Sequence, residues 1–129
     1  MRGIWVCGVL GLLPLVGCSS SVSTAASDVA SEFYRAVAAD DGAAACDLLA
    51  PQTIHELEQS SQAPCRMAIL QVDIPEAGEV VELKRFGSEA QVRLRADTAF
   101  LADFDKGWRV VAVSCASRGD LPYDCRVKG

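Results

Sequence analysis

The chain has 129 residues and a formal net charge of −5, and half of its residues are hydrophobic. This length suits one domain of ordinary size and is too short for two. The negative charge argues against nucleic-acid binding and against electrostatic docking to anionic lipid headgroups. The remaining classes are binding modules, small enzymes and structural proteins.

The first 17 residues have the layout of a secretory signal peptide. One basic residue, Arg2, precedes an apolar stretch that is shorter than a comfortable membrane span. The stretch ends in the tetrapeptide LVGC, which resembles a bacterial lipobox and closes at Cys18. In a lipobox the cysteine thiol takes the diacylglycerol and becomes the new N-terminus. We therefore expect residues 1–17 to be removed on export and the acyl chains on Cys18 to hold the protein at the outer face of the cell membrane.

The mature chain is expected to begin with a tether and to continue into helices. Residues 18–26 are small and polar, which predicts a flexible link between the lipid and a single domain at 27–129. Apolar residues then recur at helical spacing over 27–39, and Asp40 begins the sequence DDG that ends this helix. Three shorter helices are expected at residues 43–49, 51–59 and 63–70.

From residue 78 the hydrophobic period falls to two, which predicts strands. Over residues 90–96 apolar side chains alternate with polar ones, so that Arg93, Arg95 and then Asp97 are expected on a solvated face. Helices followed by an antiparallel meander predict an α+β domain with the helices packed on one face of the sheet. The other strands are expected at residues 78–86, 100–104, 108–115 and 123–127.

Four cysteines remain once the signal peptide is removed and Cys18 is lipidated. An exported chain lies in an oxidising compartment, so they are expected to pair, with three possible connectivities. We favour Cys46–Cys65 and Cys115–Cys125, because the first two lie in the helical half and the other two lie in neighbouring strands. Their spacing fits neither a C-x-x-C redox motif nor paired zinc ligands. We therefore expect structural disulfides, no metal and no other cofactor.

Several segments together resemble a known kind of protein. The sequences EFYRAVAADDGAAACDLLAP, GWRVVAVSC and PYDCRVKG, with a cysteine in an intervening helix, are similar to small actinobacterial lipoproteins. The domain of those proteins is similar to the nuclear transport factor two and ketosteroid isomerase cone. The resemblance implies helices that lie in the hollow of a strongly bent antiparallel sheet, where a ligand or an active site is often found. It includes no catalytic motif and therefore informs the fold rather than the activity.

An isomerase-type site needs a carboxylate base near a proton-donating tyrosine in an apolar pocket. The available groups are Tyr34, Asp97 and Asp103, but the alternation of the strand places Asp97 on the solvated face. We therefore expect no catalytic residue among them. His55 lies between polar residues of a short helix and is expected at the surface rather than as a general base.

Five aromatic side chains could line a cavity for an apolar ligand or could fill the core of a small domain. The core interpretation is favoured, and pocket lining remains the alternative. The residues are Phe33, Tyr34, Phe100, Phe104 and Trp108.

The sequence thus predicts a membrane-anchored envelope lipoprotein whose domain is a non-enzymatic binding or interaction module. Its expected partners are the membrane, through the lipid anchor, and either a small apolar ligand or another envelope protein. The alternative is a cone-fold enzyme of the isomerase, cyclase or hydratase type that acts on a small apolar substrate.

Overall fold

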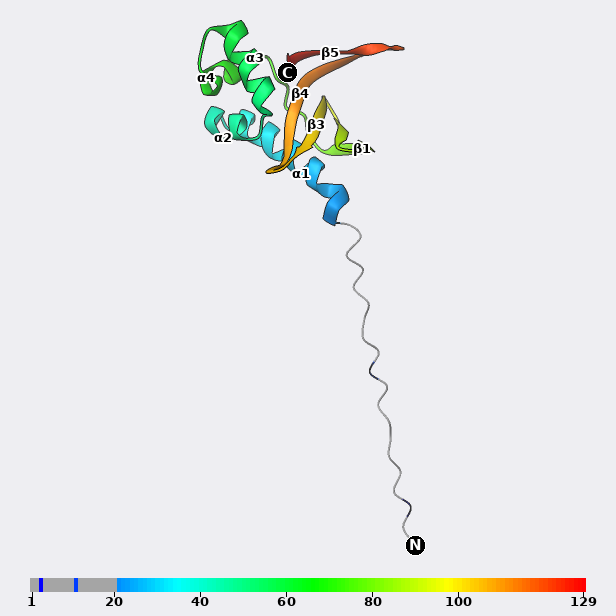
Figure 1. The fold of residues 1–129 in the computed structure, drawn as a ribbon. Coiled ribbons are helices and arrows are strands. Elements are labelled where there is room, and N and C mark those ends of the chain that lie inside the picture. Colours follow the sequence, from blue (N-terminus) through cyan, green and yellow to red (C-terminus); the bar gives the residue numbers. More distant parts are fainter. Residues whose placement is uncertain (1–2, 4–10, 12–20) are drawn as a thin grey trace.

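The computed structural model describes residues 3, 11 and 21–129, so Cys18 and the lipobox lie outside the described residues. Residues 21–129 form four helices followed by a five-stranded antiparallel sheet in the order β1-β2-β3-β4-β5 (Figure 1). The sheet is open rather than closed into a barrel. This arrangement confirms the α+β class and the order of helices before strands. Within these residues no helix is long and apolar enough to cross a membrane.

The first helix is longer than its sequence pattern predicts. Helix α1 spans Ser21–Ala38, so the expected tether is wrong for residues 21–26, which are helical. Ala26 is buried in the core, which gives this segment a packing partner. Small residues such as alanine suit a tether and a buried helix equally, so their composition does not separate the two. Only contact with the rest of the domain decides between them.

Three short helices follow α1: α2 (Gly42–Asp47), α3 (Pro51–Ser61) and α4 (Cys65–Gln71). The side chain of Asp41 caps α2 by accepting a hydrogen bond of 3.1 Å from the N–H of Ala44. The disulfide Cys46–Cys65 joins α2 to α4, as predicted. At this junction α2 and α4 pack closely, since a Cβ atom on Gly42 would lie 1.9 Å from the carbonyl oxygen of Arg66.

The strands form a meander in which each strand pairs with the next. They are β1 (Val80–Phe86), β2 (Glu89–Leu94), β3 (Thr98–Phe104), β4 (Gly107–Arg118) and β5 (Leu121–Lys128). Helix α1 contacts the first four strands and covers one face of the sheet. Residues of that face form the core with Phe33, and they include Val92, Leu101, Val110 and Val113.

The sequence pattern predicts that Val111 is buried with Phe33, and this prediction is wrong because of a bulge. The register between β3 and β4 shifts after Leu101 pairs with Val110, which leaves Val111 as the extra residue. Val110 is therefore fully buried and Val111 only partly so. The carbonyl oxygen of Val111 accepts a hydrogen bond of 2.8 Å from the hydroxyl of Thr53, which ties β4 to α3.

The far halves of β4 and β5 extend beyond β3 as a two-stranded arm, residues 115–125 (Figure 1). Ser114 at its base has a positive φ of 55°, in the left-handed region that few residues other than glycine adopt. The disulfide Cys115–Cys125 joins two directly paired residues at the base of the arm, as predicted. The arm is therefore held as a hairpin independently of the helices.

Candidate functional site

A tyrosine of α1 contacts an aspartate of the turn between β2 and β3. The hydroxyl of Tyr34 donates a hydrogen bond of 2.5 Å to Oδ2 of Asp97. Tyr34 is buried on α1, beside Phe33, whose ring contacts it edge to face at a centroid distance of 5.5 Å. Asp97 lies in the turn between β2 and β3, a turn closed by a hydrogen bond from the N–H of Leu94 to the carbonyl oxygen of Asp97.

The predicted position of Asp97 on the solvated face of a strand is wrong. Strand β2 ends at Leu94, so the alternation that placed Asp97 stops before reaching it. Instead the carboxylate accepts hydrogen bonds from the N–H of Ser114 (2.9 Å) and of Cys115 (3.1 Å). Strand β3 begins only at Thr98, so the N–H groups of Ser114 and Cys115 have no β3 carbonyl beside them. They donate to the carboxylate of Asp97 instead. We call Tyr34, Asp97 and these two backbone groups the Tyr34–Asp97 clamp.

The environment of Tyr34 favours its neutral form. Burial raises the pKa of the Tyr34 hydroxyl, and its hydrogen bond to the nearby Asp97 carboxylate raises the pKa further. Both causes act against a negative oxygen beside an existing carboxylate. The hydroxyl therefore stays protonated and remains a donor throughout the physiological pH range.

The clamp contains a tyrosine and a carboxylate, the residue types of an isomerase site, but the two side chains are hydrogen-bonded to each other. An ionised carboxylate offers about four lone-pair positions, and three hydrogen bonds occupy the carboxylate of Asp97. The proton that Tyr34 could donate to a substrate is directed at Asp97 instead. In this geometry the two residues act as a structural link between α1, the β2–β3 turn and the arm.

Two open hollows adjoin the clamp, one at Tyr34 and one at Asp97. One, of about 450 Å³, includes Tyr34 and Arg35 on its wall, with Glu76 and Glu79 from the segment before β1. The other, of about 310 Å³, includes Asp97 and Arg126. Arg126 is held there by an ion pair of 3.0 Å with Asp73. Both hollows are open to solvent, which distinguishes them from the enclosed apolar pockets that bind small ligands.

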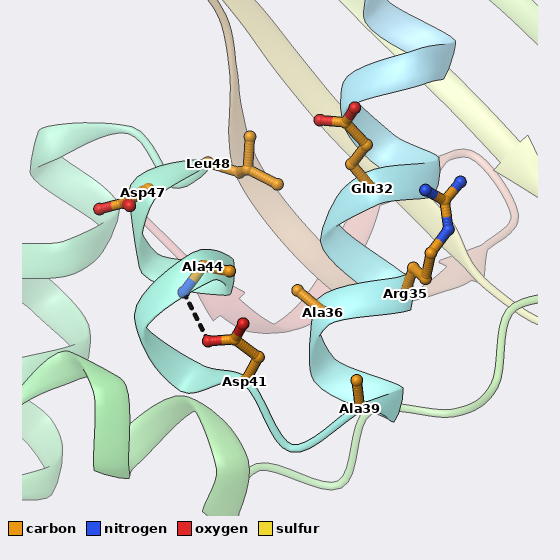
Figure 2. Close-up of a pocket in the computed structure, with 8 residues that line it drawn as sticks. All are labelled: Glu32, Arg35, Ala36, Ala39, Asp41, Ala44, Asp47 and Leu48. Carbon is orange, nitrogen blue, oxygen red and sulfur yellow. Dashed lines mark hydrogen bonds between the residues drawn. The ribbon is translucent and has the colours of Figure 1, made fainter.

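A third hollow of about 410 Å³ lies between α1 and α2, and we call it the α1–α2 groove (Figure 2). Ala36 of α1 and Leu48, just after α2, point into the gap between the helices (Figure 2). Glu32 and Arg35 extend from α1 along its edge. The other residues that line the groove are Ala39, Asp41, Ala44 and Asp47. The lining combines small apolar side chains with charged ones. Such a surface suits binding of a partner rather than catalysis of a reaction.

The five aromatic residues predicted as one set divide between the two faces of the sheet. Phe33, Tyr34 and Trp108 are buried on the side of the helices. Phe100 and Phe104 lie on the opposite, outer face, where the Phe100 ring contacts Tyr123 at a centroid distance of 5.1 Å. The five therefore do not line a common pocket. The reason is that successive side chains of β3 point to opposite faces of the sheet. Leu101 points to the core, so Phe100 and Phe104 point away from it.

The remaining predicted residues lie at the surface. His55 and Asp103 are exposed, and His55 is not part of any cluster of candidate metal ligands among residues 21–129. Arg93 forms an ion pair of 3.1 Å with Glu82, and its hydrogen bond holds the pKa of that carboxyl below its usual range, with Lys84 contributing. Arg95 pairs with Glu79 at 3.4 Å. Arg93 thus forms a cross-strand ion pair, and Arg95, just after β2, pairs with Glu79, just before β1.

Sequence reasoning named both partners of the clamp and missed their contact. The available signal was local: aspartate is a preferred turn residue, so Asp97 could equally have begun a turn instead of ending a strand. No local pattern indicates that this turn meets α1. No family model matches the chain, and no characterised protein or solved structure matches it either. The site is therefore interpreted from its own geometry.

Proposed function

We propose that this chain is a lipid-anchored envelope protein whose domain acts as a non-enzymatic binding or interaction module. The observation that carries the non-enzymatic part is the Tyr34–Asp97 clamp. Its carboxylate is bonded to a tyrosine hydroxyl and to two backbone N–H groups rather than facing an empty apolar pocket. A general base must reach the proton of a substrate, and here that position is taken by Tyr34.

The disulfides support the exported location. All four cysteines within residues 21–129 are paired, in two bridges that join neighbouring elements. Disulfides persist in oxidising compartments and are rare in the bacterial cytosol. Together with the lipobox that ends at Cys18, they favour a chain that crosses the membrane and stays attached to its outer face.

The α1–α2 groove is the surface we assign to a partner. Its apolar base includes Ala36, Ala44 and Leu48, and the charged side chains beside it would orient the occupant. The occupant we propose is a side chain of another envelope protein or a small apolar ligand.

The alternative, a cone-fold isomerase, cyclase or hydratase, is favoured by one observation, the juxtaposition of Tyr34 and Asp97. It would require the two residues to separate so that a substrate enters between them. If Asp97 moved, the N–H groups of Ser114 and Cys115 would lose their acceptor, and if Tyr34 moved, a buried side chain would leave the core. The cost of leaving such groups without a partner makes the alternative the weaker proposal.

Metabolic labelling with palmitate tests the anchor. We expect labelling of the intact chain to be lost in Cys18→Ala, because the acceptor thiol is removed. Cys7→Ala is the matched control: it removes another cysteine from the same segment and should leave labelling unchanged. Persistent labelling of Cys18→Ala would contradict the proposed function.

A further inference from the structure

Two phenylalanines are exposed together on the outer face of the sheet. Phe86 is 60% exposed and Phe104 is 43% exposed. The register pairs Phe86 with Glu89 and Glu89 with Ala102, so Phe86 and Ala102 lie on the same face two strands apart. Phe104 follows Ala102 by two residues and therefore shares that face. Glu89, which is exposed, lies between Phe86 and Ala102 on the same face. We call Phe86, Ala102 and Phe104 the outer-face patch.

The two turns that carry the patch lie next to each other. The N–H of Asp103 donates a hydrogen bond of 2.8 Å to the carbonyl oxygen of Ser88, which joins the β1–β2 turn to the end of β3. The two phenylalanines are therefore separated by roughly two strand spacings of about 4.8 Å each across the sheet and by two residues, about 7 Å, along it. Side chains at this spacing, raised at one end of a sheet, can enter a surface together. Exposed aromatic groups in such a position mark a contact site.

The charge around the patch differs from that of the rest of the domain. Residues 84–89 and 102–109 contain four basic and three acidic side chains. The other residues of 21–129 contain seven basic and fourteen acidic side chains. Within this set, Lys84 pairs with Glu82 at 3.7 Å and Arg85 lies over the ring of Trp108 on the covered face. This end of the domain is therefore close to neutral, and an anionic surface would repel it less than the rest of the domain.

The proposed anchor limits which surfaces can reach the bilayer, and here the inference rests on the proposed function. Cys18 precedes the first residue of α1, Ser21, by three positions, which span about 10 Å when fully extended. The acyl chains would hold the start of α1 close to the lipid headgroups. In Figure 1 this start lies at the lower side of the domain, where the β3–β4 turn also lies, whereas α3, α4 and the arm lie at the upper side.

We propose that the outer-face patch rests on the bilayer to which the chain is anchored, with Phe86 and Phe104 inserted among the lipid headgroups and the side chain of Lys106 facing lipid phosphates. Aromatic side chains favour the membrane interface, and nearby basic residues add attraction to anionic lipids. The contact orients the domain so that the α1–α2 groove and the arm remain accessible from outside the cell.

Depth-dependent fluorescence quenching tests this orientation. The full acylated chain is reconstituted in vesicles that contain phosphatidylglycerol and brominated phosphatidylcholine, and tryptophan is introduced at one exposed apolar position at a time. Phe86→Trp and Phe104→Trp should show a blue-shifted emission and quenching several-fold stronger than the controls. The controls are Leu121→Trp on the arm and Met67→Trp on α4, which are 56% and 52% exposed in the native chain. Trp108 contributes a constant background in every variant.

Each outcome decides between the two proposals. Mass spectrometry of the same preparation reports whether Cys18 carries acyl chains. A chain without them would refute the proposed function and, with it, the inference. An acylated chain with weak quenching at positions 86 and 104, or with equal quenching at all four positions, would overturn the inference. The proposed lipid anchor at Cys18 would still be supported. A blue shift that follows protein density in the vesicle rather than bromine content would indicate contact between copies and would also overturn it.

Discussion

The two faces of the sheet carry similar residues and have different surroundings. On the covered face, Phe33 of α1 packs with Val92 and Leu101, and all three are almost completely buried. On the outer face, Phe100 is partly covered by Tyr123, and Phe104 remains exposed. Both faces follow the same period of two along β3. The difference shows that alternation identifies two faces but does not say which of them the helices cover.

The first and largest expected difference concerns the phenylalanines of the two faces. Phe33→Ala should lower the free energy of unfolding by about 3 to 5 kcal/mol, because it leaves a cavity in a closed core. Phe104→Ala, on the outer face, should cost about 1 kcal/mol or less. Urea unfolding with both disulfides intact measures the two. Equal losses would mean that the covered and outer faces do not differ as described.

The Tyr34–Asp97 clamp, at the edge of the covered face, gives the next effect. Asp97→Ala removes the acceptor of three hydrogen bonds and should cost about 2 to 3 kcal/mol. Amide resonances of Ser114 and Cys115 should shift in the same variant. Asp103→Ala, which changes an exposed aspartate on the neighbouring strand, is the control and should stay within about 0.5 kcal/mol of the native chain. A loss in Asp103→Ala as large as that in Asp97→Ala would contradict the role of the clamp.

Tyr34→Phe isolates one bond of the clamp and adds a dependence on pH. At neutral pH it should cost about 2 kcal/mol, since the lost hydrogen bond has a charged acceptor. Because the pKa of Tyr34 is raised in the folded state, the hydroxyl ionises first in the unfolded chain, near pH 10. The stabilisation is therefore complete below about pH 10 and falls by about 1.4 kcal/mol per pH unit above it.

The measurement is the difference in unfolding free energy between the native chain and Tyr34→Phe at pH 7 to 11. That difference should be constant up to about pH 10 and then decrease. The phenylalanine variant is its own control, because every other titrating group is common to both proteins. A difference that stays constant up to pH 11 would show that Tyr34 titrates as in the unfolded chain.

The smallest effect is expected for the ion pairs of the outer face. Arg93→Ala should barely change stability, because its pair with Glu82 is exposed to solvent. The pKa of Glu82 should rise toward its ordinary value, since the hydrogen bond from Arg93 is the main cause that lowers it. Arg95→Ala, which breaks the separate pair with Glu79, should leave the Glu82 titration unchanged in NMR measurements. An unchanged Glu82 titration in Arg93→Ala would contradict this assignment.

Much of the fold could be predicted from local pattern because local physics produces it. Pro51 at the first turn of α3 and the alternation around Val92 place their elements correctly. The start of α1 could not be predicted, because Ala26 becomes helical through burial in the core. Val111 was misplaced for a related reason: a bulge changes which residue of β4 faces inward, and bulges depend on the partner strand.

By itself, the sequence determined the α+β class and the order of the elements, because the hydrophobic period is a local property of the chain. It favoured one of three cysteine pairings, and the structure contains that pairing. The contact of Tyr34 with Asp97 joins residues 63 positions apart, and only the tertiary structure decided it. The same holds for the separation of Phe33 from Phe104 onto opposite faces. Such contacts depend on how α1 lies across the sheet, and that geometry results from the packing of all the elements together rather than from any one segment.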